Sequence, residues 1–160
     1  MDIISNLDFH QLIDAHQPDR LATLVVSQRD TQRYFLFDND LRLCGWTNKA
    51  TGEIRPKEIR EFENLNIQQI QPQSSNLQIF KSSNVRQLTE NELAFSGIQV
   101  VSQQIFNEMD GFGDKFSITE LYIQKCGTNL IKGFVPQDYR MMDVGKINQL
   151  AEAELFASEI

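Results

Sequence analysis

Leu21-Ala22-Thr23-Leu24-Val25-Val26 is a continuous run of apolar and β-branched residues. A run of this length and composition is typical of a strand that is buried on both faces, as in the sheets of α/β proteins. The sequence therefore predicts an inner strand over 21–26, and the rest of the fold is predicted outward from it.

On either side of this run the sequence predicts a helix and a hairpin. Apolar residues recur at a helical period over 7–17, with Asn6 or Asp8 placed to cap the helix. Downstream, two apolar runs flank Asp38-Asn39-Asp40, residue types that tolerate the left-handed positions of a turn, and they predict a hairpin over 33–47.

Helical and strand patterns continue to alternate in the second half of the chain. Ser102 is placed to cap a short helix, and Ser117 and Glu120 have the spacing of a capping box. The expected elements are strands over 93–101, 130–135 and 139–142, and helices over 103–109, 118–125 and 147–156. This alternation predicts an α/β fold class.

Length and composition are those of one globular domain. The chain has 160 residues, of which 41% are hydrophobic and 23% charged, so residues 1–160 are expected to share one core. Residues 56–89 are rich in Gln, Asn and Ser without a firm period, which is typical of an insertion or a mobile cover.

Charge and cysteine content narrow the function classes. The net charge of −7 argues against a nucleic-acid partner, because phosphate binding needs a basic face. No apolar run is long enough for a membrane span, and Asp2 and Asp8 replace the basic start of a secretory signal. Cys44 and Cys126 lack the spacing of a disulfide framework or a zinc site. We expect a cytoplasmic protein.

Two aspartates are candidate metal ligands. Asp2 lies where a short apolar stretch gives way to a loop, at the expected carboxyl end of a strand. Asp143 lies between a strand and the glycine that opens the last helix. Together they could hold one Mg²⁺, which accepts one or two carboxylates and completes its shell with water and phosphate oxygens. The alternative is that Asp143 is a helix N-cap and Asp2 part of a frayed terminus.

Four stretches carry a family resemblance when they are taken together. They are residues 1–9, residues 93–101, residues 115–122, and residues 141–145 with 150–154. In order and spacing they resemble the carboxy-terminal part of sugar-1-phosphate nucleotidyltransferases of the N-acetylmuramate-1-phosphate uridylyltransferase and mannose-1-phosphate guanylyltransferase-like type. The resemblance implies a Rossmann-like mixed sheet that lacks its amino-terminal, nucleotide-binding strands.

The same resemblance implies roles for four residues. Asp2 and Asp143 would be the Mg²⁺ ligands, and Ser96 and Gly97 would belong to a strand against which the sugar binds. The implied substrates are a sugar-1-phosphate and a nucleoside triphosphate. The sugar phosphate attacks the α-phosphorus in line, and an NDP-sugar and pyrophosphate are formed.

One part of the family pattern has no counterpart here. The family carries a GxGTR-type turn and a Pro-Lys pair ahead of the strand that ends at its first aspartate, whereas only Met1 precedes Asp2 in this sequence. A sheet without its first strands would leave an edge unpaired, so we expect a truncated chain or self-association through that edge. Alternatives to an enzyme are a non-catalytic sugar-phosphate-binding or regulatory protein, and an interaction domain without a metal.

Overall fold

A computed structural model describes residues 3–56, 91–144 and 150–160 of the chain. Asp2 and residues 57–89 of the expected polar insertion lie outside the described residues. The elements are β1 (Ile3–Ser5), α1 (Phe9–Ala15), β2 (Ala22–Ser27), β3 (Arg33–Phe37), β4 (Leu43–Asn48), β5 (Glu53–Arg55), β6 (Glu92–Val101), α5 (Ile105–Glu108), α6 (Ile118–Lys125), β7 (Ile131–Phe134), β8 (Met141–Asp143) and α7 (Leu150–Ser158).

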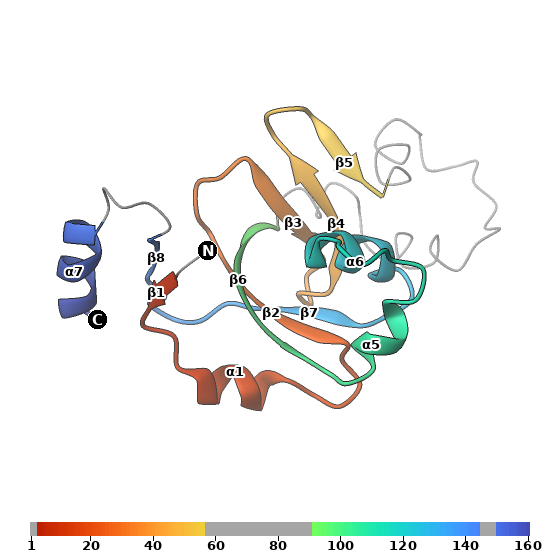
Figure 1. Cartoon of the computed structure of the whole chain (residues 1–160), viewed down its shortest axis with the longest axis horizontal. Helices are drawn as coiled ribbons and strands as arrows, with labels where there is room; N and C mark the ends of the chain where they lie inside the picture. Colours follow the sequence, from red (N-terminus) through yellow and green to blue (C-terminus); the bar gives the residue numbers. More distant parts are fainter. Residues whose placement is uncertain (1–2, 57–90, 145–149) are drawn as a thin grey trace.

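The described strands form two sheets in a mixed α/β fold (Figure 1). The larger sheet has the order β5-β4-β3-β6-β2-β7, and β1 and β8 form a separate pair. Within the larger sheet β2 runs parallel to β7, and the other pairs are antiparallel. The α/β class is thus confirmed with a sheet that is mixed and mostly antiparallel.

Strand β2 is an inner strand, as predicted, and its two faces serve different layers. Leu24 and Val26 belong to the main core with Tyr122 of α6, whereas Val25 packs with Leu12 of α1 in a smaller cluster. This division follows from the alternation of side chains along a strand. A run that is apolar except for the β-branched Thr23 suits a strand that is covered on both faces.

The predicted hairpin over 33–47 is confirmed as β3 and β4. Its turn differs from the prediction, because the left-handed residue is Leu41, with φ of 57°, and not part of Asp38-Asn39-Asp40. The Asp38 carboxylate accepts a hydrogen bond from the backbone N–H of Arg42 at 2.8 Å. Side-chain capping by an aspartate therefore closes the turn.

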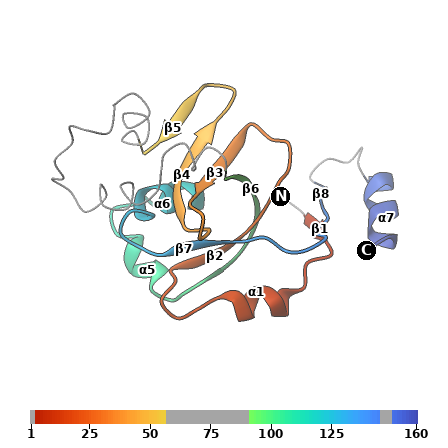
Figure 2. The same ribbon diagram turned by 180° about the vertical axis from the view of Figure 1, so that it is seen from behind.

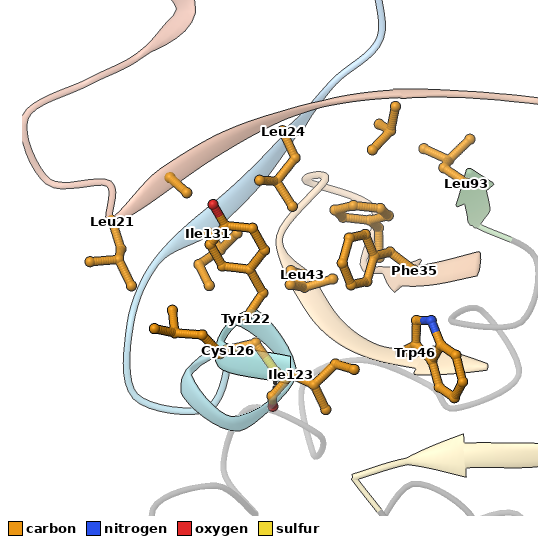
Figure 3. Packing of buried hydrophobic residues seen from close by; sticks show 14 of the residues in the cluster. Leu21, Leu24, Phe35, Leu43, Trp46, Leu93, Tyr122, Ile123, Cys126 and Ile131 are labelled. Carbon is orange, nitrogen blue, oxygen red and sulfur yellow. Dashed lines mark hydrogen bonds between the residues drawn. The ribbon is translucent and has the colours of Figure 1, made fainter. Parts of the chain in front are cut away.

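The main core lies between the larger sheet and α6 (Figure 3). Phe35 and Phe37 of β3 are almost fully buried, and their rings meet edge to face with centroids 6.3 Å apart. Cys44 and Cys126 are buried as free thiols, and the Cys126 thiol donates a hydrogen bond to the Cys44 carbonyl at 3.5 Å.

Helix α1 begins at the expected cap and is tied to β2 at its other end. The Asp8 carboxylate accepts a hydrogen bond from the His10 backbone N–H at 2.9 Å, which confirms Asp8 as the N-cap. At the carboxyl end, His16 Nδ1 lies 2.9 Å from Oγ1 of the buried Thr23. His10 and His16 thus have separate surroundings.

Two other cap predictions are wrong in detail. Gln104, not Ser102, occupies the N-cap of α5, and the Ser102 hydroxyl has no hydrogen-bond partner in the described structure. Ser117 is the N-cap of α6 but makes no side-chain cap bond, and the Glu120 carboxylate contacts Arg55 and Gln124 instead of the Ser117 backbone. The helix is predicted correctly, while the reciprocal capping bonds are not.

The pair β1–β8 lies with α7 at one end of the molecule (Figures 1 and 2). Ile3 pairs with Asp143 and Ile4 with Met142, so residues from opposite ends of the sequence become neighbours. The Asn6 side chain reinforces the pair, since its Oδ1 accepts from the Arg140 N–H at 2.8 Å. No described helix is long and apolar enough to cross a membrane.

Candidate functional site

A cleft of about 760 Å³ opens between the β3–β4–β5 part of the sheet and the start of α6. Aromatic, charged and hydroxyl-bearing side chains contribute to it, a mixture that suits a small polar ligand. Its lining residues are Arg29, Thr31, Arg33, Tyr34, Phe35, Trp46, Asn48, Glu53, Arg55, Phe95, Ser117, Thr119, Glu120 and Asp143.

The loop between β2 and β3 is held in place by its own hydrogen bonds. Arg29 Nη2 donates to the Phe95 carbonyl at 3.2 Å, which joins the loop to β6. The Thr31 backbone N–H donates to the Tyr34 hydroxyl at 3.0 Å. Arg29 and Arg33, on either side of Thr31, are therefore carried by an ordered turn at the cleft.

Arg55 forms the centre of a second wall. Its Nη1 lies 2.6 Å from Glu120 Oε2, and its guanidinium lies 4.8 Å from the centre of the Trp46 ring. Its Nε lies 3.2 Å from Glu53 Oε1 without hydrogen-bond geometry. Stacking on an aromatic face and a fork of donors are properties of arginine that lysine lacks.

The Glu120 carboxylate is stabilised in its charged form. A hydrogen bond from Gln124 lowers its pKa most, and the hydrogen bond and positive charge of Arg55 add to this effect, against the opposing effect of burial. Glu120 therefore stays ionised at neutral pH and holds Arg55 against the wall of the cleft.

The three arginines of the cleft differ in how their charges are balanced. Arg55 lies within 3.2 Å of a carboxylate oxygen on each of Glu53 and Glu120. In the part of the chain that the structure describes, Arg29 and Arg33 have no carboxylate within ion-pair distance. Among the described residues, the cleft thus holds two arginines without an ion pair, in a chain whose net charge is −7.

The sequence-predicted residues are placed in three different ways. Asp143 is exposed at the end of β8 and lines the cleft. Ser96 is buried, and its hydroxyl has no hydrogen-bond partner within the described structure. Gly97 has φ of 82°, a backbone conformation that favours glycine. Neither Ser96 nor Gly97 lines this cleft, but the preceding residue Phe95 does.

Asp2 lies outside the described residues, so its position relative to Asp143 stays a prediction. The following residue, Ile3, pairs with Asp143 across the β1–β8 ladder. Among residues 3–56, 91–144 and 150–160, no group of three or more His, Cys, Asp or Glu side chains could hold a metal ion.

Sequence reasoning missed the arginines and the tryptophan. Trp46 is the single tryptophan of the chain, and it sits on the predicted hairpin, which is a signal that could have been used. Arg55 could not be found in the same way, because the three-residue strand β5 that carries it has too little pattern to predict. No protein-family model matches the chain, and no curated protein is significantly similar to it.

Proposed function

We propose that this chain is the sugar-phosphate-binding part of a sugar-1-phosphate nucleotidyltransferase. The reaction joins a sugar-1-phosphate to a nucleoside monophosphate taken from a nucleoside triphosphate, with release of pyrophosphate. The cleft receives the sugar phosphate, and Asp143, with Asp2, provides the carboxylates for Mg²⁺.

The observation that carries this proposal is the meeting of separate stretches at one cleft. The three later stretches of the family resemblance each contribute to its lining, which includes Phe95, then Ser117, Thr119 and Glu120, and last Asp143. The first stretch contributes β1, whose Ile3 pairs with Asp143. Stretches related by function, and distant in sequence, are expected to converge in this way.

Each group in the cleft has a task in the proposed reaction. The aromatic side chains of Phe95 and Trp46 provide apolar contact for a sugar ring, and the hydroxyl groups of Ser117 and Thr119 offer hydrogen bonds. Mg²⁺ supplies charge neutralisation for the reacting phosphates. Fixing the sugar phosphate in one orientation is the contribution of this chain to the rate.

Titration calorimetry tests the proposal. Mannose 1-phosphate and N-acetylmuramate 1-phosphate are each titrated into the protein with and without Mg²⁺. We expect binding that Mg²⁺ strengthens and that Asp143→Asn weakens by about tenfold or more, since a charged ligand group is lost. Asp14→Asn removes a charge from α1, away from the cleft, and serves as the matched control.

The result has two clear contrary outcomes. Equal affinities for wild type and Asp143→Asn would remove the metal role of Asp143. If neither sugar phosphate binds, the proposed substrate class is wrong. Added nucleoside triphosphate then separates an enzyme from a binding protein, since Mg²⁺-dependent binding without turnover supports a non-catalytic, sugar-phosphate-binding protein.

Self-association forms part of the same proposal. Phe9 and Ile13 lie one helical turn apart on α1, and each is 57% exposed. Strands β5 and β7 end the described larger sheet and offer edges for pairing. Light scattering after size exclusion is expected to give the mass of a dimer or larger species, and a stable monomer at all concentrations would contradict this.

A further inference from the structure

We propose that Arg29 and Arg33 recognise an anionic group, a carboxylate or a phosphate, on the small polar ligand that enters the cleft. The inference rests on the proposed function only in taking the cleft as the ligand site. It assigns to these two residues a selectivity that neither the predicted aspartates nor Ser96 and Gly97 would provide.

The first argument is the unequal balance of charge within the cleft. Arg55 is flanked by Glu53 and Glu120, with N–O distances of 3.2 and 2.6 Å, so its charge is already compensated. Arg29 makes a hydrogen bond to a neutral carbonyl, that of Phe95, and Arg33 has no described ion pair. An incoming anion therefore gains most at Arg29 and Arg33.

The second argument is that the Arg29 side chain and the Arg33 backbone are held in place before a ligand arrives, while both side chains stay exposed. Arg33 lies in β3, where its backbone pairs with Asn48 of β4. The Thr31 hydroxyl accepts a hydrogen bond from the Arg33 backbone N–H at 3.4 Å, and Arg29 is tied to β6. Because the Arg29 side chain is already held by this hydrogen bond, less of its conformational entropy is lost on binding.

The third argument concerns the remaining donors of these side chains. A guanidinium carries five N–H donors in a planar fork that matches two oxygens of a carboxylate or phosphate. Arg29 uses one nitrogen for the Phe95 carbonyl, so the rest of its fork is available to a ligand. The chain has a net charge of −7, whereas these two groups place positive charge at the cleft. This local positive charge attracts an anion.

The test compares three sugars that share one ring. Glucose 1-phosphate, glucuronate and glucose are titrated in the absence of Mg²⁺ into wild type and into an Arg29→Gln/Arg33→Gln double variant. We expect wild type to bind either anionic sugar at least tenfold more tightly than glucose, and the double variant to lose that preference. The anionic sugar that binds more tightly identifies phosphate or carboxylate as the recognised group.

Two further variants make the outcome decisive. Arg20→Gln removes the same charge outside the cleft lining and is expected to keep the preference for anions. Arg29→Lys/Arg33→Lys keeps both charges without the fork and is expected to retain part of it. Equal binding of all three sugars by wild type, an unchanged preference in the glutamine double variant, or an equal loss in Arg20→Gln would each overturn the inference.

This experiment is separate from the test of the proposed function. If the arginine variants lose anion binding while Asp143→Asn and Mg²⁺ have no effect, the anion site stands and the transferase proposal falls. If Asp143 and Mg²⁺ control sugar-phosphate binding while the arginine variants bind normally, the transferase proposal stands and the anion site falls.

Discussion

The larger sheet and the β1–β8 pair differ strongly in how deeply their side chains are buried. Leu24, Phe37 and Leu43 of the larger sheet are fully buried and share one core with α6. The β1 and β8 strands have three residues each, and every described position in them is partly or fully exposed. Burial of apolar surface therefore stabilises the first region much more than the second.

The difference matters because the cleft draws on both regions. Arg29, Trp46 and Arg55 come from the larger sheet and its loops, and Asp143 comes from the weaker pair. In the proposed function, ligand recognition falls to the more deeply buried region and metal binding to the less buried pair. A bound ligand would then join two regions of unequal stability.

The largest expected effect comes from shortening one side chain in each region and comparing the two losses of stability. Phe37→Ala removes a buried ring and is expected to lower the free energy of unfolding by about 3–5 kcal/mol. Ile4→Ala, at a half-buried position of β1, is expected to cost roughly 1 kcal/mol. Urea denaturation followed by circular dichroism gives both values, and equal losses would contradict the contrast.

The next effect is selective protection of the weaker pair by ligand. With Mg²⁺ and a sugar phosphate at a hundred times the dissociation constant, a site that needs β8 in place is stabilised by about 2.7 kcal/mol. Hydrogen exchange should then slow at the amides of β1 and β8, and Asp143→Asn should abolish the change. Uniform slowing across β2 and β4 as well would mean that the regions are not distinct.

A smaller effect is expected inside the main core. The Tyr122 hydroxyl is buried without a hydrogen-bond partner in the described structure, and burial raises its pKa. Tyr122→Phe is therefore expected to leave stability unchanged or to raise it by about 1 kcal/mol. Tyr34→Phe is the matched control, because the Tyr34 hydroxyl accepts from Thr31, and its loss should cost about 1 kcal/mol. Thermal melting of both variants decides the sign.

The smallest effect is a pH dependence at the link between α1 and β2. Burial, followed by the charge of Arg20, lowers the pKa of His16 in the folded protein. The unfolded chain then binds more protons, so stability is full above the ordinary histidine pKa of about 6.5 and falls as the pH drops below it. His16→Gln should flatten this part of the stability curve, and an unchanged slope between pH 7.5 and about 5 would contradict the assignment.

Sequence patterns predicted the interior better than the connections. The run 21–26 and the hairpin 33–47 were predictable because burial on a strand requires apolar residues in a period that the sequence displays. Strand direction was not predictable in this way, since alternation of helices and strands does not fix which strands are neighbours. The outcome is a mostly antiparallel sheet with one parallel pair.

The site shows the same limit at the level of single residues. Asp143 was predicted to follow a strand, and it is the last residue of β8, but its role as a metal ligand stays a prediction. The role of Glu120 could not be predicted, because its spacing from Ser117 indicates a local cap, while Arg55 engages it from 65 residues away in the sequence. Long-range partners of this kind have no periodic signal.

The two buried cysteines have a practical consequence for measuring these differences. Burial raises the pKa of the Cys44 and Cys126 thiols to about 12, so almost no thiolate exists at neutral pH in the folded chain. Iodoacetamide or a fluorescent maleimide can therefore react only when the main core opens. The alkylation rate would therefore report how often the larger sheet opens. The β1–β8 pair contains no cysteine, so its opening would not change this rate.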